Sequence, residues 1–240
     1  MRFDVLTLFP DMFEAVLGDS IIGRARERGL VELNFINIRD FSKNKHRKVD
    51  AYPYSGGGGM IMTPQPIYDA YRHITEGLSY KPLTIYLSPQ GRVFKQEVVK
   101  ELSGYRHIVL LCGHYEGVDQ RILDKIVDME ISIGDFVLTG GEIAAMTVID
   151  AVRRLIPGVL SNEGSYENES HYNGLLEYPQ YTRPEEFLGE KVPEILISGH
   201  HAKIEEWKRQ QSLLVTRAKR PDLLKKAELT KDDIKFLEEN

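Results

Sequence analysis

The feature that most constrains this fold is a series of five short apolar runs that are rich in β-branched residues. They span residues 3–9, 31–38, 83–87, 107–112 and 127–133. Most are almost continuously apolar rather than alternating in polarity, which is typical of strands covered on both faces. Helical stretches separate several of these runs, and they span residues 20–28, 64–74, 95–102, 118–126 and 142–155. This alternation predicts an α/β domain built on a largely parallel sheet.

The character of the sequence changes after residue 160. Residues 161–174 are polar with almost no aliphatic side chains, which is typical of a flexible linker or an active-site lid. From His201 onward the pattern is helical. We therefore predict three parts: a large α/β domain over residues 1–160, the linker over 161–174, and a small helical domain over 175–240.

The composition is that of an ordinary globular protein. Of the 240 residues, 42% are hydrophobic and 28% are charged, which excludes a disordered or fibrous chain. No apolar run reaches the length of about 20 residues that a membrane span needs, and the residues around Asp4 do not resemble a signal peptide. The single cysteine, Cys112, excludes an internal disulfide. We expect a cytoplasmic protein without a membrane partner.

Charge is segregated along the chain. The net charge of −5 by itself argues against a nucleic-acid partner. Residues 201–226, however, hold eight Lys or Arg against three acids, and residues 39–48 hold five against one. Each segment alone is more often a solvated face. Two of them on one acidic chain favour a surface that neutralises the phosphates of a nucleic acid.

Three glycine-rich segments carry candidate site residues. Residues 54–60 contain four consecutive glycines, and residues 112–119 and 131–142 each join an apolar run to a helical stretch. Glycines add little to a core but let a ligand approach the backbone. Together with the turn at 86–91, the last two segments follow predicted strands, where α/β sheets usually bind ligands. Neither a P-loop nor G-x-G-x-x-G is present, so we expect a small-molecule pocket other than a standard dinucleotide site.

Two common chemistries are disfavoured. The seven histidines include no H-E-x-x-H motif and the chain has no C-x-x-C, so we expect no metal ligands. Ser88 and Ser132 lie in no G-x-S-x-G elbow, which disfavours acyl transfer.

Four longer motifs add a resemblance to a known family. They are SPQGRVFKQEVVKEL, LLCGHYEGVDQRI, ISIGDFVLTGGEIAAMTVIDAVRRLIPGVL and GLLEYPQYTRP, which begin at residues 88, 110, 131 and 174. Together they resemble the bacterial tRNA (guanine-N1)-methyltransferases of the SPOUT class, and the resemblance covers almost the whole chain. It implies an enzyme that transfers a methyl group from S-adenosylmethionine to N1 of guanosine at tRNA position 37.

The resemblance also implies features of the fold that patterns in the sequence do not predict. One is a deep trefoil knot at the C-terminal end of the α/β domain, although knots are almost absent among folds. Another is a homodimer with its active sites at the subunit interface. The knot would form the S-adenosylmethionine site, and the cofactor-binding residues implied are Tyr86, Leu87, Ser88, Pro89, Gly113, Tyr115, Glu116, Ser132, Ile133, Gly134, Asp135, Phe136, Val137, Leu138, Gly140 and Gly141.

The implied substrate sets the catalytic requirements. N1 of guanosine carries a proton at neutral pH, so a general base must remove it while a cation stabilises charge on O6. The family's base is an aspartate in the linker, and the matching residue here is Glu169; Arg154 is the expected cation. The resemblance also implies magnesium for the chemical step. The candidate substrate-binding residues are Gly57, Gly58, Gly59, Glu177, Lys208, Arg209, Arg217 and Arg220.

Two alternatives remain open from the sequence. One is a SPOUT methyltransferase that acts on another RNA, such as ribosomal RNA. The other is a non-catalytic RNA-binding protein. Glu169 and Arg154 favour an enzyme, because a protein that only binds RNA needs neither a base nor an O6 stabiliser.

Overall fold

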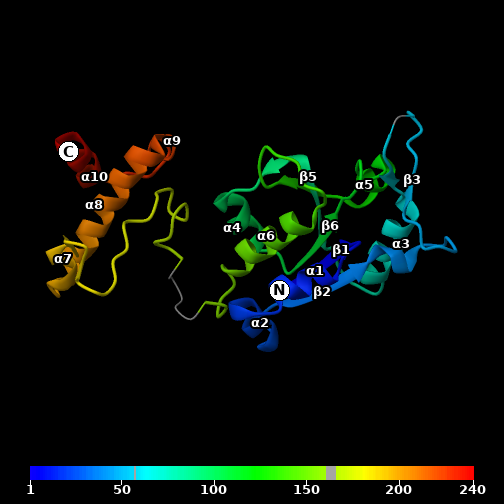
Figure 1. The fold of residues 1–240 in the computed structure, drawn as a ribbon, viewed down its shortest axis with the longest axis horizontal. Helices are drawn as coiled ribbons and strands as arrows, with labels where there is room; N and C mark the ends of the chain where they lie inside the picture. Colours follow the sequence, from blue (N-terminus) through cyan, green and yellow to red (C-terminus); the bar gives the residue numbers. More distant parts are fainter. Residues whose placement is uncertain (57, 161–165) are drawn as a thin grey trace. The chain divides into compact units, whose positions relative to one another are not determined.

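The computed structural model describes residues 1–56, 58–160 and 166–240, and the chain divides into two compact units (Figure 1). These units are Met1–Glu163 and Gly164–Asn240. The division falls within the segment 161–174, of which residues 161–165 lie outside the described residues. Residues 166–173 form hydrogen-bonded turns, in which the Tyr166 and Tyr172 rings lie 5.0 Å apart. The role of this segment as a flexible lid stays a prediction.

The first unit is built on a five-stranded parallel sheet. Its strand order is β2-β1-β6-β5-β7, and the strands are β1 (Arg2–Thr7), β2 (Glu32–Asn37), β5 (Leu83–Val93), β6 (His107–Cys112) and β7 (Met129–Ser132). Every pair of neighbouring strands is parallel. The predicted α/β class and its parallel sheet are confirmed.

Helices cover both faces of this sheet (Figure 1). On one face pack α1 (Asp11–Leu17), α2 (Ser20–Glu27), α4 (Gln96–Ser103) and α6 (Glu142–Arg153); on the other pack α3 (Pro64–Thr75), α5 (Gln120–Ile126) and the short 3-10 helix η1 (Ile38–Phe41). Ile108 and Leu110 of β6 belong to the first core, whereas Val109 and Leu111 belong to the second. Because β6 needs apolar side chains on both faces, its sequence is continuously apolar from Ile108 to Cys112.

A break in β5 gives the sheet an irregular carboxyl edge. Ile131 of β7 pairs with Leu87 before the break and with Arg92 after it, so the residues between them leave the ladder. After the break, the chain runs very close to β7 at Gly91. A Cβ at this position would lie 2.4 Å from the backbone nitrogen of Ile131. Only glycine fits such an approach. The trefoil knot stays a prediction.

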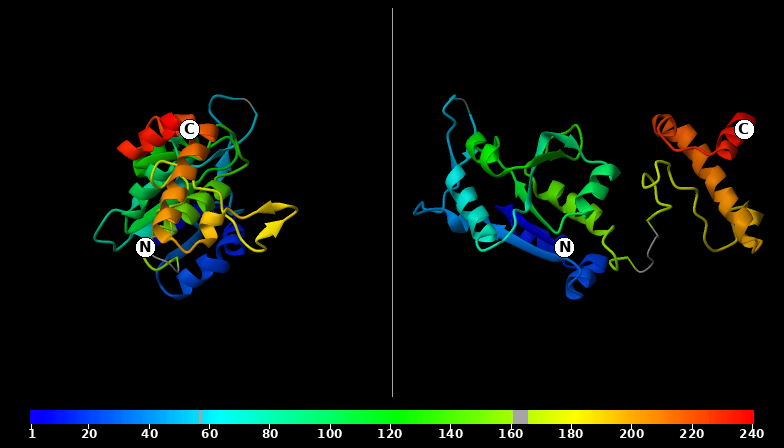
Figure 2. Two further views of the ribbon diagram at one scale, coloured as in Figure 1. Left: turned by 90° about the vertical axis from the view of Figure 1, so that its left-hand side faces the viewer. Right: turned by 180° about the vertical axis from the view of Figure 1, so that it is seen from behind.

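The second unit is mainly helical, as predicted. It contains α7 (Glu194–Ile197), α8 (His201–Lys219), α9 (Pro221–Leu224) and α10 (Lys231–Glu239), together with the two-residue strands β8 (Glu186–Phe187) and β9 (Glu190–Lys191). This small hairpin, which the sequence did not predict, stands off α8 (Figure 2). Leu213 and Thr216 of α8 are fully buried, and a capping box of Thr230 and Asp233 begins α10. Among the helices of the described residues, none combines the length and the hydropathy that a membrane-spanning helix requires.

Candidate active site

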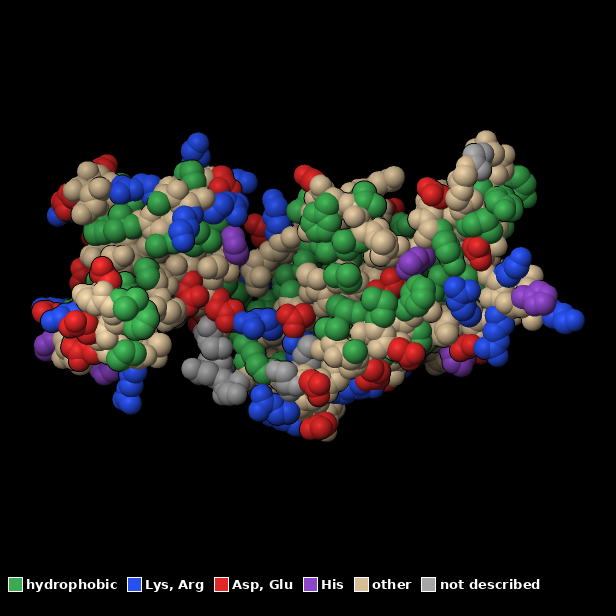
Figure 3. Space-filling model, in the orientation of Figure 1, with side chains coloured by type: hydrophobic (Ala, Val, Ile, Leu, Met, Phe, Trp, Pro, Cys, Tyr) green, Lys and Arg blue, Asp and Glu red, His purple; other side chains and the backbone are tan. Residues whose placement is uncertain are grey.

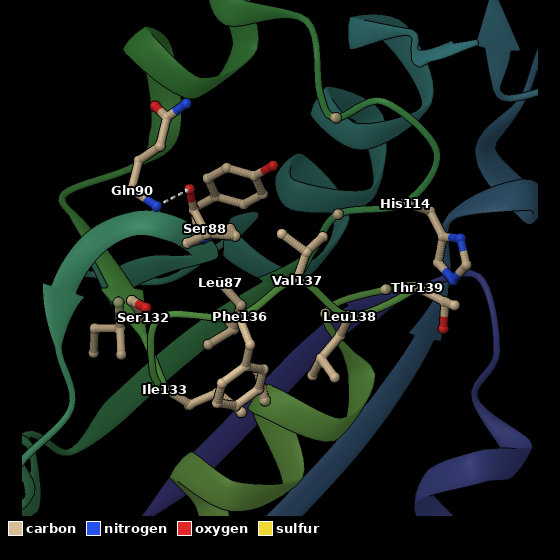
Figure 4. Close-up of a pocket in the computed structure, with 18 of the residues that line it drawn as sticks. Leu87, Ser88, Gln90, His114, Ser132, Ile133, Phe136, Val137, Leu138 and Thr139 are labelled. Atoms are coloured by element: carbon tan, nitrogen blue, oxygen red, sulfur yellow. Dashed lines mark hydrogen bonds between the residues drawn. The ribbon is translucent and has the colours of Figure 1, made fainter. Parts of the chain in front are cut away.

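A pocket of about 340 Å³ opens at the break in β5 and at the carboxyl ends of β6 and β7 (Figure 4). Three loops form it, at residues 86–90, 113–117 and 131–141, and Ala144 of α6 completes the lining. Every residue that the resemblance implies for cofactor binding lines this pocket, except Asp135, which is exposed outside it. The pocket therefore brings together residues that are spread over almost 60 positions of the sequence.

Short polar contacts within the loops of the pocket hold their turns in shape. The backbone N–H of Gln90 donates to Ser88 Oγ at 3.2 Å (Figure 4). Ser132 Oγ donates to the carbonyl of Gly134 at 3.0 Å, and Gly134 adopts a φ of +150°. Such side-chain contacts to nearby backbone hold turns in place without regular structure.

Aromatic and aliphatic side chains make the remaining walls. The Tyr86 ring lies over Gly113, where a Cβ would come within 2.8 Å of its hydroxyl oxygen. Burial, together with the nearby Glu130, raises the pKa of Tyr86, so its hydroxyl stays protonated near neutral pH. At the mouth, Phe136 is 53% and Val137 is 82% exposed. Exposed apolar side chains around a pocket are typical of a binding site.

Glu116 brings a carboxylate to the pocket and contacts the glycine-rich loop. That loop joins the two strands of a hairpin, β3 (Asp50–Ala51) and β4 (Ile61–Met62). The N–H of Glu116 donates to the Met60 carbonyl at 2.9 Å. At Gly59, with a φ of +92°, a Cβ would lie 2.4 Å from Glu116 Cγ. Gly59 therefore lies beside the pocket acid, Gly58 is its exposed neighbour, and Gly57 lies outside the described residues.

The basic segment 39–48 reaches the same wall. Arg39 Nη2 donates to the hydroxyl of Tyr115 at 3.2 Å, and Tyr115 has the unusual φ of +60°. Beyond this segment, Tyr52 is 80% exposed and Tyr54 is fully exposed. The first unit thus presents bases and exposed aromatic rings on segments connected to its pocket.

The two predicted catalytic residues belong to different units. Arg154 follows the last residue of α6 and is half-buried. Glu169 is half-buried in a turn of the second unit, where its N–H donates to the Tyr166 carbonyl at 3.2 Å. Glu177 is in the same unit and accepts a hydrogen bond from Gln180 Nε2 at 2.6 Å. Their catalytic and substrate-binding roles stay predictions.

Four basic residues predicted to bind RNA have partners within the second unit. Arg209 holds the buried carboxylate of Asp233 through Nε at 3.1 Å and Nη2 at 2.8 Å. Arg217 donates to the Leu237 carbonyl at 3.0 Å, Lys208 Nζ lies 2.7 Å from Glu205, and Arg220 pairs with Asp222 at 2.7 Å. The Arg220 hydrogen bond lowers the pKa of Asp222 to about 2. Arg209 in particular has a structural role in addition to any contact with RNA.

Metal binding finds no support in the described residues. Outside positions 57 and 161–165, no group of three or more His, Cys, Asp or Glu side chains could hold a metal ion. The magnesium ion implied by the resemblance therefore has no all-protein site among these residues.

The pocket also includes residues that the sequence did not single out. They are Gln90, His114, Gly117, Ile131, Thr139 and Ala144. All but Ala144 lie inside the predicted segments 86–91, 112–119 and 131–142. A prediction that took every residue of these segments as a candidate would have included them. Glu142 ends the predicted segment 131–142, but no local signal marks its contact with Thr7, which joins residues 135 positions apart.

Comparison with known proteins identifies close relatives of the whole chain. The family model described as tRNA (Guanine-1)-methyltransferase TrmD matches residues 1–226. The tRNA (guanine-N(1)-)-methyltransferase of Ruminiclostridium cellulolyticum is 65% identical over 226 residues, which cover 94% of this chain and 97% of that protein. The proteins of the same name from Clostridium beijerinckii and Clostridium perfringens strain 13 are 60% and 57% identical over 237 residues, with at least 98% of each chain covered.

Proposed function

The chain belongs to the tRNA (guanine-1)-methyltransferase family of the SPOUT class, and we propose that it methylates N1 of guanosine 37 in tRNA, using S-adenosylmethionine. It is a methyltransferase that modifies tRNA. The observation that carries the proposal is the pocket at the break in β5 and the carboxyl ends of β6 and β7, which brings together the loops 86–90, 113–117 and 131–141. We also propose that the enzyme works in the cytoplasm, where tRNA is matured in bacteria.

The pocket residues fit S-adenosylmethionine in size and in chemistry. A volume of about 340 Å³ falls within the range of small-molecule sites. Leu87, Ile133 and Leu138 offer apolar contact for the adenosine part, and the Glu116 carboxylate offers charge complementary to the cationic end. When bound, this cofactor supplies an electrophilic methyl group on a positively charged sulfonium.

The chemistry of guanosine assigns roles to two further residues. Glu169 acts as the general base that removes the N1 proton. Arg154 donates hydrogen bonds to O6 and stabilises the negative charge that grows there. The pocket loops hold N1 in line with the methyl group, so positioning provides much of the remaining acceleration.

Each unit contributes a basic segment to the proposed RNA binding. In the second unit, Lys203, Lys219, Lys225 and Lys226 are exposed. In the first unit, the segment 39–48 connects to the pocket through the contact of Arg39 with Tyr115. Exposed Tyr52 and Tyr54 suit stacking on bases of a single-stranded loop. An RNA with a folded stem and an unpaired loop matches this combination of charges and aromatic rings.

A homodimer is the proposed assembly. Apolar side chains gather over α1 and α6, which pack against each other (Figure 3). Met12 is 42%, Val16 is 55% and Ile143 is 51% exposed. Contiguous exposed apolar side chains favour a protein interface. Analytical ultracentrifugation should give twice the chain mass of 27.5 kDa, and a purely monomeric enzyme would contradict this assembly.

The nucleoside product tests the proposed function. The protein is incubated with methyl-labelled S-adenosylmethionine and either bulk tRNA or ribosomal RNA, and the RNA is digested to nucleosides. We expect label in N1-methylguanosine from tRNA. Label only in ribosomal RNA would favour a different substrate, and RNA binding without any transfer would favour a non-catalytic protein.

A further inference from the structure

Glu142 carries a buried carboxylate that the proposed mechanism does not use. It is the first residue of α6, and only 2% of it is exposed. Its Oε1 accepts a hydrogen bond from Thr7 Oγ1 at 2.8 Å, at the carboxyl end of β1. Burying a carboxylate costs free energy unless hydrogen-bond partners replace the water that it loses. The contacts of the Glu142 carboxylate therefore indicate which parts of the fold it stabilises.

The second oxygen of this carboxylate faces the pocket wall. Glu142 Oε2 lies 3.5 Å from Nε2 of His114. The His114 ring packs against the Phe9 ring, with centroids 5.0 Å apart. His114 lines the pocket and lies beside Thr139 (Figure 4). The carboxylate thus joins the end of β1 to the loop 113–117.

Gly140 lies directly against the same pair. A Cβ at this position would lie 2.3 Å from His114 Nε2 and 2.5 Å from Glu142 Oε2. The next residue, Gly141, donates its N–H to the Gly113 carbonyl at 2.9 Å. Two walls of the pocket, the loop after β6 and the loop after β7, therefore meet at the contact between Glu142 and His114.

We propose that Glu142 is a positioning residue for the methyl donor: through His114 it holds the loop 113–117 against the loop 139–141 and fixes the spacing of two pocket walls. This inference rests on the proposed function, because it takes the pocket as the S-adenosylmethionine site. The contact supports cofactor affinity rather than the chemical step, since neither side chain is needed at N1 or O6 of the guanine.

The substitution Glu142→Gln tests the proposal, because it keeps the size of the side chain and removes its charge. We expect S-adenosylmethionine to bind about tenfold more weakly in isothermal titration calorimetry, a difference of about 1.4 kcal/mol. KM for the cofactor should rise by a similar factor, while kcat at saturating cofactor changes by less than about twofold. His114→Ala should act similarly, and the two effects should not add in the double variant, because both remove the same interaction.

Two buried threonines provide a matched control. Thr7→Val removes the hydroxyl that donates to Glu142, whereas Thr84→Val removes a β5 hydroxyl that has no hydrogen-bond partner in the described part of the chain. Both side chains are fully buried in the same sheet. We expect Thr7→Val to weaken cofactor binding and Thr84→Val to leave it unchanged.

The measurements distinguish a positioning role of Glu142 from a purely structural one. They also distinguish failure of this proposal from failure of the proposed function. Melting temperatures are measured for every variant. An unchanged cofactor Kd in folded Glu142→Gln overturns the proposal, even where the melting temperature falls. A wild-type protein that binds the cofactor but forms no N1-methylguanosine overturns the proposed function alone, and a wild-type protein that does not bind the cofactor overturns both.

Discussion

At the residue scale, the sharpest prediction concerns Glu169. Glu169→Gln removes the proposed base but keeps the shape of the side chain. We expect the single-turnover rate of tRNA methylation to fall by about 10²–10⁴-fold, the usual contribution of a general base. The affinity for S-adenosylmethionine should not change, because the pocket residues lie in the other unit.

Glu167→Gln is the matched control, since it removes the same charge from an exposed side chain in the same segment. It should keep nearly full activity. A Glu169→Gln enzyme as fast as the Glu167→Gln control would show that the base lies elsewhere.

Asp4, three residues before Thr7 in β1, gives a second residue-scale prediction. Its buried carboxylate accepts hydrogen bonds from His107 Nε2 and Asn34 Nδ2, each at 2.7 Å, and from Arg2 Nε at 3.0 Å. Burial raises its pKa, but these hydrogen bonds outweigh burial and hold the pKa of Asp4 below its ordinary value of 3.8. A lowered folded-state pKa adds stability at pH values above the ordinary pKa. That stability is lost as pH falls from the ordinary pKa through the folded-state pKa.

Asp4→Asn should therefore cost about 3–5 kcal/mol of unfolding free energy at neutral pH, as expected when one partner of a buried ionic cluster is removed. The difference from the wild type should shrink below about pH 4, in urea titrations at a series of pH values. Glu32→Gln, which removes an exposed partner of Arg2 at 3.8 Å, should cost less than about 1 kcal/mol. A constant difference between Asp4→Asn and the wild type from pH 2 to pH 7 would contradict this account.

At the element scale, the sequence predicts structure best where local pattern and burial agree. The run 107–112 becomes β6 without a change of boundary, because both of its faces are buried and Gly113 follows it. The run 83–87 extends to Val93, because the chain pairs with β7 again after its turn, and this second pairing has no local signal. The short helix α1 was missed, because a helix of seven residues has only about two turns and gives a weak helical period.

The candidate site also has parts that local sequence patterns predict and parts that they do not. The pocket loops were predictable, because glycines at strand ends and the family resemblance point to the same residues. The contact between Thr7 and Glu142 was not, because nothing local marks two residues that lie 135 positions apart. The predicted knot and the proposed dimer would depend in the same way on chain paths and surfaces that local patterns do not encode.

At the scale of the whole molecule, the net charge of −5 conceals two basic segments. Charge reversal at Arg209 would test little about RNA, because it would also leave the buried Asp233 carboxylate without its partner. The exposed lysines Lys225 and Lys226 are cleaner probes. Lys225→Glu/Lys226→Glu should weaken tRNA binding by at least about tenfold. The slope of log affinity against log salt concentration should become shallower by about one unit for each phosphate that is no longer neutralised.

Two lysines of α10 provide the control for this measurement. Lys231 and Lys235 are also exposed, but they lie outside the basic segment 201–226. Lys231→Glu/Lys235→Glu should leave the salt dependence of tRNA binding unchanged. Equal weakening in both double variants, measured by filter binding over a series of salt concentrations, would indicate a general charge effect rather than a defined RNA surface.

The most direct test of the central claim uses two tRNA transcripts that differ only at position 37. With S-adenosylmethionine in excess, the transcript with guanosine 37 should gain close to one methyl group per molecule, recovered as N1-methylguanosine by mass spectrometry of the digested RNA. The transcript with adenosine 37 should react at least about a hundredfold more slowly, because it lacks the O6 and N1–H that Arg154 and Glu169 are proposed to recognise. Equal methylation of the two transcripts, or a methyl group on any other nucleoside, would contradict the account.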